Sequence, residues 1–294
     1  MTPAPPLKPW FGVLRLWSLT ASTVPVTVGA ALAAREGRFS WALLALCLLS
    51  GWLLQTATNL LNTYGDFRSG VDTADAPPTA PQLVDGTLRP RAVFTAGLLL
   101  LLLGAAAGLA AAALSDCRLL LFAAAGVAGA AGYTTGVRFK YAGLGVPLVA
   151  LLMGVLMTAA SHFAQTRALS WQALLVSLPV ACLVAAVLHG NDLRDTATDR
   201  NAGIKTATLL LGPRAARGLF AALHLAAYLI PAAAVPLRLL PPGTLLPLLV
   251  LPLSLAAVRA CLRGDTRPLE QRSAGIHFLF GILLTLGLLL PSHA

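Results

Sequence analysis

The chain has 294 residues, of which 57% are hydrophobic and only 11% are charged, and its mean hydropathy is +0.78. This composition excludes a soluble domain built on one core, because apolar runs close to the roughly 20 residues that cross a bilayer follow one another along the chain. The formal net charge of +10 lies mainly between those runs, so we expect the lipid bilayer as a partner and no nucleic acid. The sequence therefore predicts an all-α, polytopic membrane protein with a single domain over residues 1–294.

Nine apolar segments are long enough to be membrane spans. Prolines between positions 231 and 252 interrupt the seventh and eighth segments, which predicts kinks or shortening there. The four cysteines lie far apart inside or beside these segments, without a metal-binding spacing, and we interpret them as small packing residues. The segments are 11–34, 41–63, 93–114, 118–137, 144–163, 170–189, 216–235, 243–262 and 273–290.

The basic residues are distributed unevenly between the two sets of loops. Sixteen of the 21 lysines and arginines lie near the N-terminus or after the second, fourth, sixth and eighth segments. Cytoplasmic loops of membrane proteins carry an excess of Lys and Arg. We therefore predict that the N-terminus and these loops face the cytoplasm and that the C-terminus lies outside, in what we expect to be a bacterial inner membrane.

The second segment ends in a polar motif, NLLNTYGDFRSGVD, at residues 59–72. Asn62 and Asp66 are four residues apart and share a helix face, and Asp72 follows them. The loop that continues to about residue 92 is long for a helical bundle, and loops of this length are commonly lids or linkers. We favour a lid, because the loop leaves the polar motif directly.

The sixth segment ends in a second polar motif, HGNDLRDTATDRNAGIKT, at residues 189–206. Asn191, Asp195 and Asp199 recur every four residues, so on a helix the two carboxylates would repel each other. A Mg²⁺ ion would offset that repulsion, because it binds one or two carboxylates and completes its shell with water and phosphate oxygens. The alternatives are a solvated charged loop and, for the basic residues of the motif, plain topological bias. Those basic residues are Arg194, Arg200 and Lys205.

Carboxylates that close membrane spans indicate a functional site whose partner is a cation. A metal-bound diphosphate beside apolar segments predicts a substrate with a charged head and a hydrophobic tail, and a prenyl diphosphate fits that description. One alternative is a cation-coupled transporter, but transporters usually hold their ions near the bilayer midplane. The other is a structural membrane protein, which leaves both motifs unexplained. We therefore favour an enzyme with Mg²⁺ as its cofactor.

These motifs, with three further stretches, resemble the UbiA superfamily of intramembrane prenyltransferases, and within it the 1,4-dihydroxy-2-naphthoate prenyltransferases. The resemblance runs nearly from end to end of the chain. It implies about nine transmembrane helices around a central cavity open to the lipid, with a cytoplasmic cap formed by loops at about 64–92, 137–143 and 190–215. The further matching stretches are RLWSLTASTVPVTVGAAL (15–32), LVDGTLRP (83–90) and GYTTGVRFKYAGLG (132–145).

The resemblance also implies roles for individual residues. Four carboxylates would bind the metal, and these are Asp66, Asp72, Asp195 and Asp199. The remaining residues of the catalytic set are Asn62, Asn191 and Lys140. The two tyrosines among the substrate-binding residues also fit the alternative of interface anchors. The substrate-binding set is Arg15, Asn59, Arg68, Tyr133, Tyr141, Arg194, Arg200 and Lys205.

The activity that the resemblance implies is transfer of a prenyl chain from prenyl diphosphate to an aromatic acceptor. The GVD end of the first motif, LVDGTL and FKYAGLG are similar to the naphthoate branch, which implies 1,4-dihydroxy-2-naphthoate as acceptor, loss of CO₂, and a place in menaquinone biosynthesis. The chain departs from the pattern of the family that it resembles at Val146, where an acidic residue is common, and at Pro81 and Gln82, where an arginine is common. The alternative acceptors are 4-hydroxybenzoate, homogentisate and a glycerol phosphate lipid.

Overall fold

The computed structural model describes residues 8–68, 70, 72, 80–134, 139, 142–201 and 203–291. Within these residues the fold is all-α, and the only strand-like pairing is an isolated bridge between Ala142 and Lys205. The helices in order are α1 (Lys8–Leu14), η1 (Leu16–Leu19), α2 (Thr20–Arg35), α3 (Trp41–Arg68), η2 (Pro81–Leu83), α4 (Pro90–Leu114), α5 (Leu119–Thr134), α6 (Gly145–Val149), η4 (Ala150–Leu156), α7 (Met157–Thr166), α8 (Trp171–Arg194), α9 (Thr196–Asn201), α10 (Ala207–Leu211), α11 (Pro213–Ala234), η5 (Pro242–Val250), α12 (Leu251–Arg263) and α13 (Leu269–Leu289).

Eight helical segments in the described part of the chain are long and apolar enough to cross a membrane, and they match eight of the nine predicted spans. The predicted span 118–137 corresponds to α5, whose apolar part, Leu119–Gly129, is shorter than the others. The length and apolar character of these helices make the chain an integral membrane protein. The central cavity open to the lipid stays a prediction.

The helices differ from the predicted spans where polar residues lie. The second span runs to Arg68 and the sixth to Arg194, each five residues beyond the predicted end, so the polar motifs extend the helices. The first span is not one continuous helix, because Arg15 takes a left-handed conformation (φ 49°, ψ 52°) between α1 and η1. In the eighth span, the prolines coincide with a 3₁₀ helix, η5, that precedes α12.

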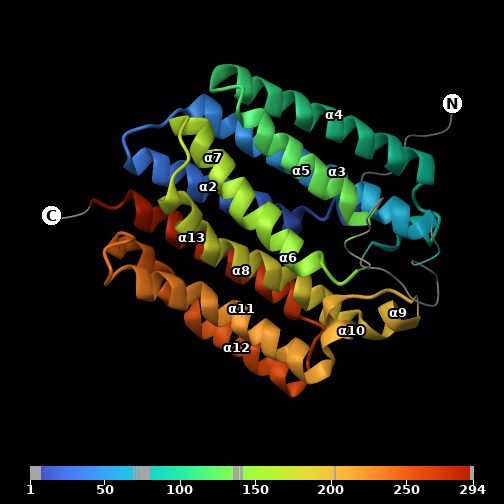
Figure 1. Cartoon of the computed structure of the whole chain (residues 1–294). Coiled ribbons are helices and arrows are strands. Elements are labelled where there is room, and N and C mark those ends of the chain that lie inside the picture. The colour runs from blue at the N-terminus through green and yellow to red at the C-terminus, as the bar shows by residue number, and fades with distance from the viewer. Residues whose placement is uncertain are drawn as a thin grey trace.

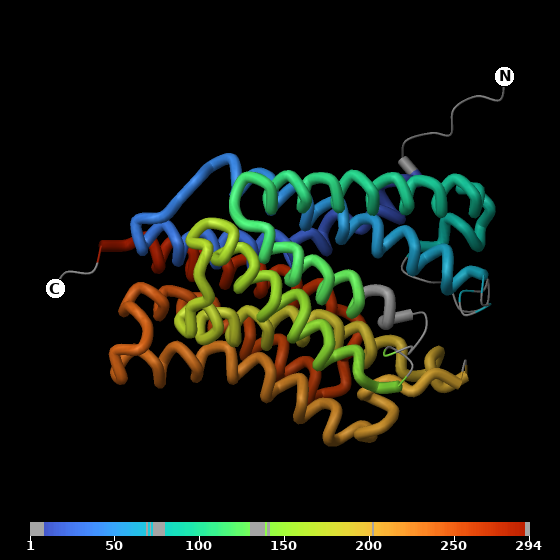
Figure 2. The backbone as a smooth tube through the Cα atoms, turned by 45° about the horizontal axis from the view of Figure 1, so that its top comes forward, coloured from blue at the N-terminus to red at the C-terminus, as the bar shows by residue number. Residues whose placement is uncertain are grey.

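Helices α2, α8 and α13 form the centre of the bundle (Figure 1). Helix α13 packs against α2, α8 and η5, while α8 also packs against α11 and α2 also packs against α7. The long helices α3 and α4 pair along one side, which Figure 2 shows as the blue and green layer. Outer helices expose leucines, such as Leu102 of α4 with 66% of its surface exposed, as expected for contact with lipid tails.

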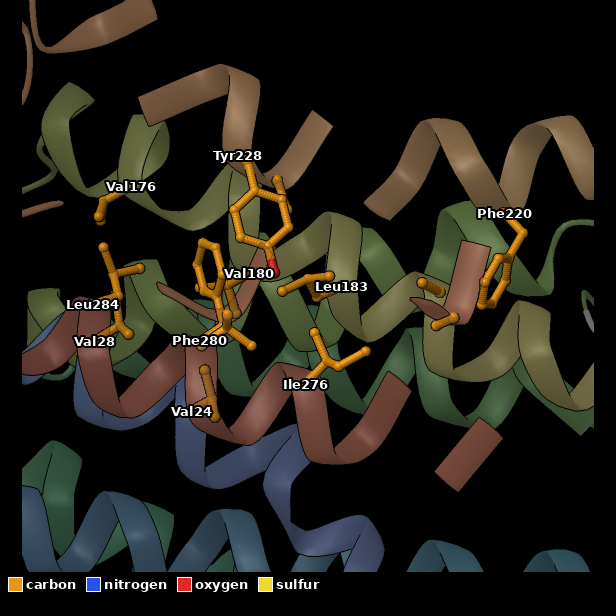
Figure 3. Packing of buried hydrophobic residues seen from close by; sticks show 14 of the residues in the cluster. Val24, Val28, Val176, Val180, Leu183, Phe220, Tyr228, Ile276, Phe280 and Leu284 are labelled. Carbon is orange, nitrogen blue, oxygen red and sulfur yellow. The ribbon is translucent and has the colours of Figure 1, made fainter. Parts of the chain in front are cut away.

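The largest buried cluster lies between α2, α8, α11 and α13 (Figure 3). The rings of Phe280 and Tyr228 meet edge to face, with centroids 5.4 Å apart. Three polar groups beside this cluster are paired, because Ser254 bonds to the Tyr228 hydroxyl at 2.7 Å and to His224 Nδ1 at 3.2 Å. His162, His224 and His277 are all buried, so they pack within the protein.

Replacing Phe280 with alanine will destabilise this cluster, because it removes a fully buried ring and leaves a cavity. The expected loss is about 3–5 kcal/mol in the free energy of unfolding. Phe278, two residues away on α13 and 40% exposed, provides the matched control. Thermal unfolding in detergent should show a much smaller shift for Phe278→Ala than for Phe280→Ala. Equal shifts would mean that α13 does not bury the Phe280 face.

Candidate active site

The two polar motifs lie at the same end of the bundle, opposite the end at which α13 finishes (Figures 1 and 2). Residues 59–68 form the last turns of α3, and residues 189–201 form the end of α8 and the short helix α9. The fold thus brings together two stretches that are more than 100 residues apart in sequence.

In the first motif, Asn62 and Asp66 lie on the last turns of α3 and are both half-buried. The backbone N–H of Asp72 donates to the carbonyl of Asp66 at 3.3 Å, so the chain turns back onto the helix end. Arg68, the last residue of α3, is exposed. The turn keeps both aspartates of this motif at the helix terminus.

Asn59 has a different environment from the other residues of this motif, because it is buried. Its Nδ2 donates to the carbonyl of Leu14 at 3.1 Å and to the hydroxyl of Ser18 at 2.8 Å. These acceptors flank the break in the first span. Asn59, predicted to bind substrate, therefore uses its amide N–H groups to fix the break.

Arg15 lies at that break, in a conformation that is uncommon for residues other than glycine. Its Nε atom is buried without a hydrogen-bond partner. Its guanidinium is also an electrostatic neighbour of Glu270, in the first turn of α13. A strained backbone held by neighbours is a recurrent feature of functional sites.

In the second motif, backbone hydrogen bonds continue past the end of α8. The N–H of Asp195 donates to Asn191 at 2.9 Å, and the N–H of Asp199 donates to Asp195 at 2.9 Å. The predicted helical spacing of these three residues is therefore confirmed, although the chain bends at Asp195 between α8 and α9.

Arg194 is the most connected side chain of the site. It donates to both carboxylate oxygens of Asp195 at 2.7 Å and to Oδ1 of Asn191 at 2.7 Å. A fourth hydrogen bond joins it to the carboxylate of Glu270. Arg194, predicted to bind the diphosphate, thus has most of its donors committed to protein groups and positions the second motif.

Glu270 is a site residue that the sequence patterns did not indicate. It is buried at the start of α13 and pairs with Arg194 of α8. Gly190 permits this contact, since a Cβ there would lie 2.9 Å from the backbone nitrogen of Glu270. In the sequence, Glu270 appears only as a single acidic residue at the start of an apolar span. Nothing in the sequence shows that it pairs with Arg194.

Described residues of the loops near the motifs pack at this end of the bundle, and the cytoplasmic cap stays a prediction. Three residues of the loop after α3 are buried against α1 and α3, and they are Ala80, Leu83 and Leu88. Ala142, after α5, pairs with Lys205, after α9. Arg200 and Lys205 are exposed, so their charges are available to a ligand.

Some predicted residues fall outside this description. Lys140 and Tyr141 lie outside the described residues, as does the side chain of Tyr133. His189, which lies close to the motif, is fully buried, and its Nε2 bonds to the carbonyl of Ala216 at 2.7 Å. This contact joins α8 to α11, so His189 has a packing role.

The oxygen donors at this end of the bundle lie in two separate groups. Among the described residues, no three Asp, Glu, His or Cys side chains converge closely enough to hold a metal. The carboxylates are divided between the ends of α3 and α8–α9 instead. Mg²⁺ requires only one or two carboxylates from a protein and takes its other ligands from water and phosphate. Two separate oxygen-donor motifs therefore fit a magnesium diphosphate better than a metal ion held by protein alone.

The fold and the site define an all-helical integral membrane protein with paired Asn/Asp motifs at one end of the bundle. The chain belongs to the UbiA prenyltransferase family, whose sequence model matches residues 22–283. It is thus an enzyme, a membrane prenyltransferase, and the transporter and purely structural alternatives are set aside.

Animal relatives match almost the whole chain. UbiA prenyltransferase domain-containing protein 1 of Ailuropoda melanoleuca is 33% identical over 94% of this chain and 82% of the relative. The protein of the same name from Gallus gallus is 34% identical over 94% of this chain and 83% of the relative.

Solved archaeal structures show the same fold. A UbiA homologue from Aeropyrum pernix K1 superposes with a TM-score of 0.69 at 21% identity, covering 93% of this chain and 97% of that structure. A UbiA homologue from Archaeoglobus fulgidus bound to GPP and Mg²⁺ gives a TM-score of 0.66 at 18% identity, covering 96% and 99%.

Glu270→Gln tests the ion pair that joins α8 to α13. We expect it to lower the free energy of unfolding by about 1–3 kcal/mol, because a buried donor loses its charged acceptor. Prenyl transfer should fall with it, since Arg194 then holds Asp195 less firmly. Thermal unfolding and turnover are measured beside Gln271→Ala, a change at the exposed neighbouring position. If both variants behave alike, Glu270 does not position the site.

Proposed function

We propose that this protein catalyses the Mg²⁺-dependent transfer of a prenyl chain from prenyl diphosphate to an aromatic acceptor. The observation that carries the proposal is the placement of both Asn/Asp motifs at one end of a UbiA-family bundle. The structure from Archaeoglobus fulgidus that holds GPP and Mg²⁺ supports the choice of diphosphate and metal.

The oxygen donors of both motifs would bind the magnesium diphosphate. Asp66 and Asp72 at the end of α3, with Asp195 and Asp199 beyond α8, would hold Mg²⁺ on the diphosphate. The amide oxygens of Asn62 and Asn191 would complete the two sets. Exposed cations beside the motifs would contact the remaining diphosphate oxygens by charge-assisted hydrogen bonds. These cations are Arg68, Arg200 and Lys205.

The chemistry follows from charge and shielding. Mg²⁺ bound here would neutralise the negative charge that develops on the departing diphosphate. The allylic C–O bond breaks, the prenyl carbon bonds to the aromatic ring, and the ring loses the group it carried at that carbon, as CO₂ or a proton. The protein contributes by aligning the two reactants and by excluding water from the allylic cation.

For the acceptor, we propose 1,4-dihydroxy-2-naphthoate, with decarboxylation, in menaquinone biosynthesis. Its two hydroxyl groups make the ring electron-rich at the carbon that bears the carboxylate. Arg15, with its unpartnered buried Nε, is the cation we propose to bind the acceptor's acid group. Val146 packs with Ala185 and Ala207 in a small apolar cluster. We therefore attribute the valine at this position, where an acidic residue is common in the family, to packing.

We also propose that the motif end of the bundle faces the cytoplasm. The excess of basic residues in the loops at that end supports this orientation. We propose a bacterial inner membrane as the location. The relatives described above come from animals and archaea, so they do not test this proposal.

Cysteine labelling from one side of the membrane tests the orientation. Cys117, between α4 and α5, is exposed at the end away from the motifs. An impermeant maleimide should label it only from outside. In a Cys117→Ser background, Thr196→Cys should be labelled only from the cytoplasmic side. The reverse pattern would place the site outside the cell.

Asp66→Asn and Asp195→Asn test the metal role. Each should reduce turnover at least roughly a hundredfold while the protein still inserts in the membrane, because each removes charge that stabilises the leaving group. Excess EDTA should have the same effect on the unmodified protein. Asp116→Asn is the control, since this carboxylate lies at the opposite end, where hydrogen bonding by Arg118 lowers its pKa to about 2. Full activity in EDTA would disprove the metal role.

The same assay identifies the acceptor. Purified protein with Mg²⁺ and a panel of prenyl diphosphates is supplied with 1,4-dihydroxy-2-naphthoate, 4-hydroxybenzoate, homogentisate or a glycerol phosphate lipid. Mass spectrometry should detect a prenylated, decarboxylated product from the first. Prenylation of 4-hydroxybenzoate with no reaction of the naphthoate would refute the proposed acceptor and leave the metal-diphosphate chemistry standing.

A further inference from the structure

A charged hollow lies at the junction of α12 and α13. Its volume is about 380 Å³, and its lining is Ala256, Arg259, Ala260, Arg263, Asp265 and Arg272. Helix α12 packs on α11, α13 and η5, at the edge of the bundle away from α3 (Figure 1). Arg272 is exposed, whereas Glu270, which faces the active site, is buried two residues earlier. The hollow and the active site are therefore on different faces of α13.

The hollow has an excess of positive charge that the protein does not neutralise. Three guanidinium groups, from Arg259, Arg263 and Arg272, face a single carboxylate, that of Asp265. In the part of the chain that the structure describes, none of these four side chains forms an ion pair or a hydrogen bond. The guanidinium of Arg217, from α11, lies beside Gly264 and adds a further positive charge nearby. This environment favours an anion with several acceptor oxygens.

The surface next to the hollow is apolar. Leu253, Ala256, Ala260 and Arg263 are spaced i, i+3, i+7 and i+10, so they follow one face of α12. Leu253 is 50% exposed on this membrane-spanning helix, and the two alanines leave space between the arginines. The face therefore changes from apolar, within the membrane, to cationic, at the helix end. A soluble phosphate would use only the cationic part, whereas a phospholipid would use both.

We propose that this hollow binds the phosphate headgroup of an anionic phospholipid, with an acyl chain along the Leu253–Ala256 face of α12. Basic pockets between transmembrane helices are suited to such headgroups. The bound phosphate would connect Arg259 and Arg263 of α12 to Arg272 of α13. It would thereby stabilise the junction of two helices that have no side-chain ion pair between these residues.

Binding is measured on the full-length protein in neutral detergent. Native mass spectrometry follows retention of phosphatidylglycerol as its concentration is raised, with phosphatidylcholine and inorganic phosphate as separate arms. We expect saturable binding of phosphatidylglycerol with a rise in melting temperature, and neither effect from the other two. Binding of phosphatidylcholine with equal affinity would overturn the proposal, and so would an equal rise in melting temperature with inorganic phosphate.

Two kinds of variant locate the binding. Arg259→Gln combined with Arg263→Gln should weaken phosphatidylglycerol binding roughly tenfold to thirtyfold, the scale expected for two basic contacts with an anionic lipid. Arg89→Gln combined with Arg91→Gln makes the same change in charge at two exposed positions before and within α4, and should bind as the unmodified protein does. Equal losses in both pairs would show that only net charge matters and would overturn the site.

Ala260→Leu provides a test that keeps every charge. It fills the space between the arginines, so it should also weaken binding while the protein keeps its fold. This variant tests the binding site even if the protein with both Arg259→Gln and Arg263→Gln is unstable. Unchanged affinity in the Ala260→Leu variant would overturn the hollow as the binding site.

Discussion

The hydrogen-bonded ion pairs of Arg194 are the interaction on which the candidate active site depends. Clustered carboxylates at the end of a helix repel one another, and a single guanidinium offsets part of that repulsion by binding Asp195, Asn191 and Glu270 together. Because Glu270 comes from α13, the same side chain also joins α8 to a neighbouring helix. A charge pair in such a place stabilises the fold only when its groups are well hydrogen-bonded, and here Arg194 makes four such contacts. Close approach of the backbones at Gly190 makes the arrangement possible.

The break in the first span connects this network to the other motif. Asn59 of α3 holds the backbone on both sides of Arg15, and the positive charge of Arg15 lies near Glu270. The ends of α3, α8 and α13 are thus related through one arginine in an unusual conformation. This arrangement gives the two Asn/Asp motifs, at the ends of α3 and α8, a common neighbour. The contacts of Asn59 also explain why Arg15, near the start of an apolar span, has no regular helical conformation.

Two polar regions of opposite character lie at the ends of helices in this bundle. The active-site region is rich in carboxylates, which suits a metal diphosphate, whereas the α12–α13 hollow is rich in arginine, which suits a phosphate without a metal. The arginines of the hollow and the buried Glu270 of the active-site region lie on different faces of α13. Contact with lipid along α12 has a physical basis in the exposed leucines of that helix.

The sequence by itself determined the class of the protein, the number of apolar segments to within one, the motif residues and their helical spacing. These properties depend on composition and on local periodicity, which a linear chain displays directly. Only the tertiary structure decided that Asn59 fixes a helix break, that Arg194 binds protein groups, and that Glu270 belongs to the site. Each of these depends on contacts between residues far apart in the chain, such as the 76 positions between Arg194 and Glu270. Sequence periodicity cannot show which face of one helix meets another, because that choice is made by packing and by the close approach of backbones.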